Sequence, residues 1–203
     1  LVVVDVQPAG VDGMYQVTFD GKGSVYMTAS GDHFFVGDLY ELGENRIINI
    51  TEEQKNGPRA ELISSISRDD MIIFSPEGEV KASVVVFTDV DCGYCRKLHN
   101  EVPKMNALGI EIKYMAYPRA GIGSDSYNKI ASAWCADDRQ KALTTLKTGG
   151  TIPTNVCDGN PVPEQFNAGL RVGLSGTPAI VLESGELIPG YMPADKLAKT
   201  LGI

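Results

Sequence analysis

The chain has 203 residues, of which 43% are hydrophobic and 22% are charged, and these proportions are typical of a globular protein. Its formal net charge of −8 disfavours binding to a phosphate backbone, so we expect no nucleic-acid partner. The sequence has no apolar run of about 18 residues, and we expect no transmembrane helix. It also has no basic segment followed by an apolar one at its start, so we interpret it as a mature or trimmed form without its signal peptide.

Residues 1–50 predict a small domain of strands and turns. Strands are expected over residues 14–19, 23–29, 33–36 and 46–50, with a turn at residues 30–32. A sheet of this size has little core of its own, so it must cover an apolar face on the rest of the chain or on a second copy. For Phe34, Phe35 and Val36 we favour a shared dimer interface over a purely internal role.

Residues 51–70 predict a linker with a short helix over residues 59–67. Pro58 suits the first position of that helix. The segment is more polar than its surroundings and is interrupted by Gly57 and Pro58, which is typical of a connection between domains.

Residues 71–203 predict an α/β domain, because strand and helix patterns alternate along them. Strands are expected over residues 80–88, 110–117, 179–183 and 186–188, the last two forming a hairpin around Ser184 and Gly185. Helices are expected over residues 92–107, 125–148, 161–172 and 193–201, and Pro103 should kink the first of them.

The four cysteines are Cys92, Cys95, Cys135 and Cys157. Two disulfide pairs are compatible with this number, but the sequence alone leaves three connectivities open. A zinc site would favour two closely spaced pairs, whereas Cys135 and Cys157 are far apart and the two histidines fit no ligand pattern. We therefore expect no metal and no organic cofactor.

The segment from Cys92 to Cys95 predicts redox chemistry rather than an inert disulfide or half of a metal site. A strand ends near Thr88, and Cys92 then opens a helix, whose free N–H groups and positive dipole end stabilise a thiolate. Cys95 lies one turn further on, where it can attack a mixed disulfide formed at Cys92. The sequence therefore predicts Cys92 as the attacking thiol.

Several neighbouring residues have simpler interpretations. His99 is expected to be a packing or helix-surface residue rather than a catalytic base, and Trp134 a core residue. Asp89 and Asp91 are candidates for capping the helix, although their charges would also oppose a thiolate. Pro178, which begins a strand, is a candidate for a cis peptide bond.

These motifs together resemble the DsbC-type protein disulfide isomerases of the bacterial periplasm. The resemblance covers essentially all of residues 71–203 and, more weakly, the first 50. It rests on residues 87–95, 97–99, 117–119, 134–136, 173–179 and 187–191. The interrupted linker departs from the family pattern.

The resemblance implies a C-terminal thioredoxin fold with a helical insertion and an N-terminal cystatin-like domain that forms a homodimer. Cys92 matches the nucleophile and Cys95 the resolving cysteine, while Thr177 and Pro178 match a cis-proline loop beside them. Cys135 and Cys157 match a structural disulfide in the insertion. Tyr94 is expected to contact clients. A membrane-bound thiol reductase of the DsbD type is implied as a partner, and misfolded disulfide-bonded proteins as clients.

The sequence thus predicts an α/β protein with a dimerisation domain at residues 1–50, a linker at 51–70 and a catalytic domain at 71–203. The predicted activity is isomerisation of wrong disulfides in client proteins, with chaperone-like client binding, in the periplasm. The alternatives are an oxidase that donates its disulfide to clients and a holdase chaperone. The N-terminal domain argues against a monomeric oxidase.

Overall fold

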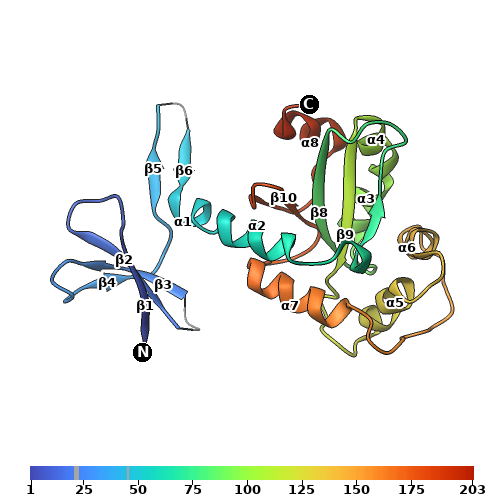
Figure 1. Ribbon diagram of the computed structural model, residues 1–203, viewed down its shortest axis with the longest axis horizontal. Coiled ribbons are helices and arrows are strands. Elements are labelled where there is room, and N and C mark those ends of the chain that lie inside the picture. Colours follow the sequence, from blue (N-terminus) through green and yellow to red (C-terminus); the bar gives the residue numbers. More distant parts are fainter. Residues whose placement is uncertain (21–22, 45) are drawn as a thin grey trace. The chain divides into compact units, whose positions relative to one another are not determined.

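The computed structural model describes residues 1–20, 23–44 and 46–203. The chain divides into two compact units, Leu1–Gln54 and Lys55–Ile203, each of which contains its own sheet (Figure 1). The mixture of helices and strands confirms the predicted α/β class.

The N-terminal unit is built mainly from antiparallel strands. Its described residues form a four-stranded sheet in the order β1 (Val3–Pro8), β2 (Met14–Phe19), β3 (Gly23–Thr28) and β4 (Phe34–Phe35). A separate hairpin of β5 (Tyr40–Leu42) and β6 (Ile47–Asn49) leads into the short helix α1 (Ile50–Glu53). The predicted turn between β3 and β4 is present, and Gly31 adopts a φ of 76° there, which favours glycine. No individual strands were predicted at β1 and β5.

The core of the N-terminal unit is small. Among its described residues only three apolar side chains are buried, namely Ala9, Val17 and Tyr26. The Tyr26 hydroxyl shares a hydrogen bond with Thr51 Oγ1, which ties α1 to the sheet. Many larger apolar side chains are exposed, including Phe34 at 66% and Val36 at 75%. An apolar surface of this kind is typical of an interaction site.

The C-terminal unit is organised around a mixed five-stranded sheet. The order in the described residues is β11 (Leu187–Pro189), β10 (Ala179–Leu182), β8 (Ala82–Thr88), β9 (Ile110–Ala116) and β7 (Ile72–Phe74). The central pair β8 and β9 is parallel, and the remaining pairs are antiparallel. Every side chain of β8 after Ala82 is buried, as expected for a strand covered on both faces.

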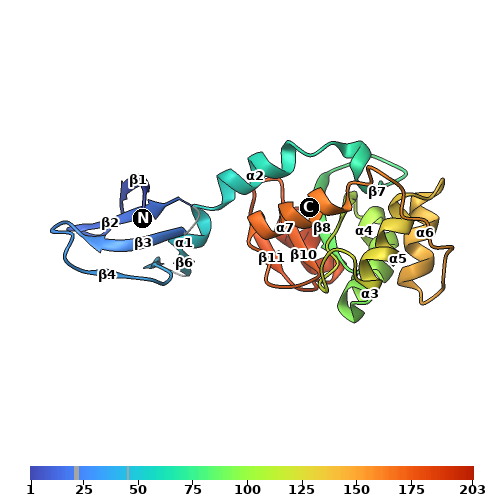
Figure 2. The same ribbon diagram turned by 90° about the horizontal axis from the view of Figure 1, so that it is seen from below.

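Helices cover both faces of this sheet (Figures 1 and 2). One apolar core includes Leu98, Met105, Ile130, Leu143 and Leu197, which belong to the helices of one face. These helices are α3 (Gly93–Asn100), α4 (Val102–Ala107), α5 (Asp125–Trp134), α6 (Arg139–Lys147) and α8 (Ala194–Leu201). The other face packs against α7 (Val162–Val172) and α2 (Asn56–Ser64).

Three predicted helices differ in detail from the structure. The helix expected over residues 92–107 breaks at Glu101 into α3 and α4, and Pro103 occupies the first turn of α4, where its missing N–H is harmless. The helix expected over residues 125–148 is interrupted between α5 and α6. The helix expected over residues 59–67 begins earlier, at Asn56, so Pro58 is not its first residue.

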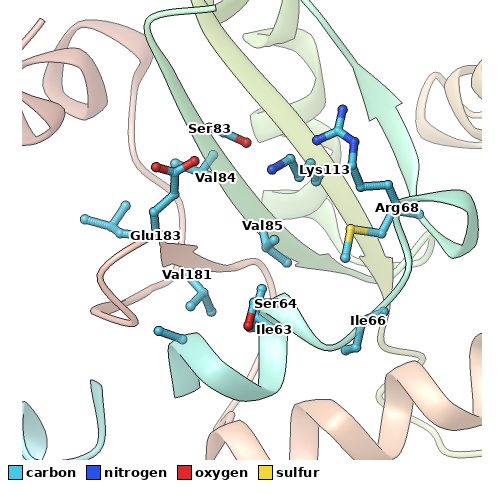
Figure 3. A pocket seen from close by; sticks show the side chains of 13 residues that line it. Ile63, Ser64, Ile66, Arg68, Ser83, Val84, Val85, Lys113, Val181 and Glu183 are labelled. Carbon is cyan, nitrogen blue, oxygen red and sulfur yellow. The ribbon is translucent and has the colours of Figure 1, made fainter. Parts of the chain in front are cut away.

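An open pocket of about 360 Å³ lies between α2 and the sheet (Figure 3). Val85 and Val181 contribute apolar lining, and Glu183, Arg68 and Lys113 lie around it. Both cations are ion-paired with Glu111, at 2.9 Å for Arg68 and 3.6 Å for Lys113. Both cations at the pocket are therefore paired with a carboxylate and do not form a free cationic site.

Candidate active site

Cys92 lies at the junction of the strand β8 and the helix α3. It is the N-cap of α3, and its Sγ accepts a hydrogen bond from Cys95 N at 3.3 Å. The hypothesis that Asp89 or Asp91 caps this helix is therefore wrong. Asp89 Oδ1 instead accepts from the backbone of Asp91, which shapes the turn before the helix. The local sequence thus places the sulfur of Cys92 at the positive end of α3.

The environment of Cys92 favours its thiolate. Cys92 is a free thiol, only 4% exposed, and its Sγ–H donates to the carbonyl of Thr177 at 3.2 Å. Burial raises the pKa of Cys92, but its interactions with Cys95 and Thr177 and the charge of Arg119 outweigh this effect. The resulting pKa lies below the usual value for a thiol, which increases the fraction of reactive thiolate.

Cys95 lies in the opposite environment. It is a free thiol, fully buried in the first turn of α3. Burial raises the pKa of Cys95 above its usual value, although the positive charge of Lys147 acts in the other direction. The two thiols therefore differ in acidity and access, and this difference distinguishes an attacking thiol from a resolving one.

The loop before β10 faces the dithiol. The Thr177–Pro178 peptide bond is cis, and the Thr177 carbonyl reaches Cys92. The Thr177 hydroxyl is buried and has no hydrogen-bond partner among the described residues, so it is available to a thiolate. Tyr94, between the two cysteines, is 65% exposed and is accessible to a bound polypeptide. The structure therefore brings four of the predicted site residues close to Cys92: Cys95, Tyr94, Thr177 and Pro178.

Asp89 is a buried carboxylate that organises the loops around the site. It accepts hydrogen bonds from the Ser126 hydroxyl and from both the backbone and the guanidinium of Arg119. Burial alone would raise the pKa of Asp89, but these bonds and that of the Asp91 backbone lower it. Arg119 is consequently held where its charge favours the Cys92 thiolate.

His99 is a packing residue, and its helix-surface interpretation is wrong because the side chain is 5% exposed. One ring nitrogen shares a hydrogen bond with the Tyr114 hydroxyl at 3.1 Å and the other with Thr144 Oγ1 at 3.0 Å. Burial, together with the charge of Lys147, lowers the pKa of His99 to about 4. The imidazole is neutral and both of its ring nitrogens are hydrogen-bonded, so His99 is part of the core rather than a base at the dithiol.

The other two cysteines are joined to each other. Cys135 and Cys157 form a disulfide with a Cα–Cα distance of 5.8 Å. The chain segment between the two cysteines contains α6, the helix that packs against α3. Trp134, next to this bond, is 1% exposed and donates its Nε1–H to the carbonyl of Asp70 at 2.7 Å, as expected for a core residue. The disulfide thus ties down the helical segment behind the dithiol.

Sequence reasoning missed three residues of the site. Ser126 and Arg119 fix Asp89, and Lys147 lies buried behind the dithiol. Arg119 belongs to a motif that supported the family resemblance, but its electrostatic role was not predicted. No local pattern singles out Lys147, because it is far in sequence from the two cysteines and a lysine is rarely buried.

Within the described residues, no cluster of three or more His, Cys, Asp or Glu side chains is suited to a metal ion. None of the described helices is long and apolar enough to cross a membrane.

The fold and the dithiol define the class of the protein. Residues 68–202 match the thioredoxin-like domain family, and residues 1–52 match the disulfide bond isomerase protein N-terminal domain family. The C-terminal unit thus has a thioredoxin-like fold, with α5 and α6 forming a helical segment between β9 and α7.

Comparison with whole proteins narrows this class to one family. The chain is 36% identical to thiol:disulfide interchange protein DsbC of Escherichia coli over 197 residues, which cover 97% of this chain and 80% of the relative. Identity to the DsbC protein of Haemophilus influenzae is 33% over 195 residues, covering 95% and 81%. A crystal structure of a disulfide interchange protein from Neisseria gonorrhoeae is 34% identical, with a TM-score of 0.59 and coverage of 68% and 96%. The chain belongs to the DsbC family of thiol:disulfide interchange proteins.

Proposed function

We propose that the chain is a disulfide isomerase in which the Cys92 thiolate attacks wrong disulfides in client proteins. It is a thiol:disulfide oxidoreductase of the DsbC family. The observation that carries the assignment to Cys92 is the contrast between the two thiols. Cys92 caps α3 and has a lowered pKa, whereas Cys95 is fully buried with a raised one.

The reaction begins when the Cys92 thiolate attacks one sulfur of a client disulfide. A bond forms between Cys92 and that sulfur, the client S–S bond breaks, and the second client sulfur leaves as a thiolate. In isomerisation this client thiolate attacks another disulfide of the same client, and a client thiolate finally displaces Cys92. The dithiol then ends in the state in which it began.

Cys95 provides a second exit from the mixed disulfide. Its thiolate attacks Cys92, so that the client leaves reduced and the enzyme holds a disulfide between Cys92 and Cys95. A thiol reductase must then return two electrons to the enzyme. We assign this role to a membrane-bound reductase of the DsbD type, as the family resemblance implies.

Client binding is assigned to the surface around Cys92. Tyr94 is exposed beside the nucleophile and offers an aromatic ring to a partly unfolded chain. Thr177 and Pro178 form the opposite wall of the site, where the Thr177 carbonyl already accepts a hydrogen bond. Backbone groups of a client can pair with this loop while its disulfide meets Cys92.

The N-terminal unit is assigned to dimerisation. We propose residues 1–50 as the dimerisation domain, residues 51–70 as the linker and residues 71–203 as the catalytic domain. The small core and the exposed Phe34 and Val36 support a shared interface between two copies. A homodimer would present two dithiols to one client and would give the chaperone-like binding that isomerisation requires.

The periplasm is the proposed compartment. The disulfide between Cys135 and Cys157 supports an oxidising environment, because such bonds are rare in the cytosol. Delivery there by a signal peptide belongs to the same proposal.

Reactivation of scrambled ribonuclease in a glutathione buffer tests the proposed function, with the oligomeric mass taken by light scattering from the same sample. The proposal expects a dimer that reactivates the scrambled substrate, and a Cys92→Ala variant that does not. A monomer that oxidises reduced ribonuclease without unscrambling it would indicate an oxidase. A Cys92→Ala variant with unchanged reactivation would contradict an enzymatic role and leave a holdase.

A further inference from the structure

Lys147 is a buried ammonium behind the dithiol. It ends α6 and is 1% exposed. Its Nζ donates to Thr88 Oγ1 at 2.5 Å and to the carbonyl of Asp89 at 2.8 Å. Both acceptors are neutral, and no carboxylate of the described residues forms an ion pair with this lysine. A buried ammonium without an ion-paired carboxylate is costly, so its presence at this position requires an explanation.

The surroundings of Lys147 connect it to the dithiol. Thr88 and Asp89 are the last residue of β8 and the first of the turn that leads to Cys92. The helix α6 packs against α3, and a hydrogen bond between Thr144 and His99 joins the two helices. Cys95 lies one turn before His99 on α3, and Lys147 lies one turn after Thr144 on α6, so both residues lie along the contact between the two helices.

The charged and titratable groups around Lys147 are few. Asp89 is ionised and attracts the ammonium, as thiolates at Cys95 and Cys92 would, whereas Arg96 repels it. His99 is neutral because burial and the charge of Lys147 lower its pKa to about 4. Among these groups, Cys95 is the one that is fully buried and must lose a proton during the reaction.

We propose that the Lys147 ammonium is the counter-charge of the Cys95 thiolate, which makes Lys147 a positioning residue for the step in which Cys95 resolves the mixed disulfide. This inference rests on the proposed function and deepens it. Burial lowers the pKa of Lys147 to about 8, so the ammonium is still the main form at neutral pH. The charge of Lys147 also opposes the rise that burial imposes on the pKa of Cys95.

Resolution of the mixed disulfide by Cys95 involves no proton transfer between the enzyme and the client. Cys95 loses its proton to solvent, and its thiolate attacks the Cys92 sulfur of the mixed disulfide. The bond between Cys92 and the client breaks, and the client sulfur leaves with the electron pair. The enzyme is oxidised by two electrons and the client disulfide is reduced by two, and the thiol reductase restores the dithiol. Lys147 stabilises the thiolate that this step forms at the fully buried Cys95.

The titration of Cys95 tests this directly. In a Cys92→Ala background Cys95 is the only free thiol, and its ionisation is followed by the ultraviolet absorbance of the thiolate against pH. Lys147→Met should raise the midpoint of this titration, since it removes the charge. Lys147→Gln should do the same while keeping a hydrogen-bond donor toward Thr88 and Asp89. Circular dichroism identifies whichever variant is folded. An unchanged midpoint in a folded variant would overturn the proposal.

Thr144→Val is the matched control for packing. It removes the hydrogen bond between Thr144 of α6 and His99 of α3 without changing any charge. The proposal expects Thr144→Val to leave the Cys95 titration unchanged. An equal shift in Thr144→Val and Lys147→Met would assign the effect to docking of α6 and contradict the electrostatic role.

The rate of resolution provides the second measurement. Enzyme carrying glutathione on Cys92 is prepared, and release of glutathione by Cys95 is followed at neutral pH. Lys147→Met should slow release about threefold for each tenfold loss of thiolate, because a more basic thiolate is also the better nucleophile. Unchanged release would contradict the proposal. Neither measurement uses isomerase activity, so failure of the proposed function would be recognised separately, by the ribonuclease assay.

Discussion

The two units of the chain differ in how far they bury their own apolar side chains. The C-terminal unit covers both faces of its sheet with its own helices and buries side chains as large as Trp134 and Phe87. The N-terminal unit buries only Ala9, Val17 and Tyr26 among its described apolar residues and leaves larger ones in solvent. We infer that the first unit covers its apolar surface on a partner, whereas the second has a core of its own that positions the dithiol.

The largest effect is expected at the exposed surface of the N-terminal unit. Phe34→Ser combined with Val36→Ser should convert the dimer to a monomer and abolish isomerisation, because an apolar interface is replaced by a polar one. Glutathione-dependent reduction at Cys92 should persist, since the C-terminal unit keeps its own core. Light scattering and the ribonuclease assay measure the two outcomes. Val80→Ser, at an exposed apolar residue of the C-terminal unit, is the control and should remain dimeric.

The second effect concerns how the C-terminal unit holds α6 in place. Replacing both Cys135 and Cys157 by serine should lower stability by about 3 kcal/mol, the loop-closure entropy that a crosslink of this span removes from the unfolded chain. Urea unfolding at neutral pH measures the change. A variant as stable as the parent would show that the packing of Trp134 and α6 suffices without the bond.

The third effect lies at the buried carboxylate Glu111. Glu111 accepts hydrogen bonds from Arg68, Ser75 and Ser83, and the bond from Arg68 is the main reason why its pKa is lowered to about 2. We expect Glu111→Gln to lower the free energy of unfolding by about 2 kcal/mol at neutral pH. This is less than the pKa shift of Glu111 alone would give, because Arg68 is largely exposed and solvent screens its charge.

The pH dependence of that effect has a definite sign. A carboxylate with a lowered pKa in the folded state stabilises the protein above its usual pKa near 4.5, and this stabilisation is lost as the pH falls toward about 2. The difference in urea midpoint between Glu111→Gln and the parent should therefore shrink across this range. A difference that is constant with pH would assign the effect to packing.

The smallest effect is expected at the surface ion pair between Lys104 and Asp195. The two side chains are 54% and 73% exposed, and solvent screens their attraction. Lys104→Met should leave the urea midpoint unchanged within error. A loss comparable to that of Glu111→Gln would contradict the view that buried and exposed charges contribute differently in this unit.

The sequence predicted those parts of the molecule that local patterns specify. The run of β8, the turn after it and the helix at Cys92 follow from adjacent residues, and the site could be located from them alone. The strands β5 and β7 were not predicted, because three residues show too little alternation. The break at Glu101 was foreseen only as a kink at Pro103.

The missing parts of the site depend on contacts between distant segments. Asp89 was considered as a helix cap, but the fold brings Ser126 and Arg119 to it instead. Lys147 follows β8 by many residues and reaches Thr88 only because α6 packs beneath α3. Such contacts depend on tertiary packing, which cannot be predicted from a single stretch of sequence.

Trapping the mixed disulfide tests directly whether Cys92 is the attacking thiol. A Cys95→Ala variant is mixed with scrambled ribonuclease, quenched with acid and digested, and the peptide joined to the client is identified by mass spectrometry. We predict that the client is attached to the peptide that contains Cys92. Attachment through Cys135 or Cys157, or no attachment while reactivation continues, would contradict it.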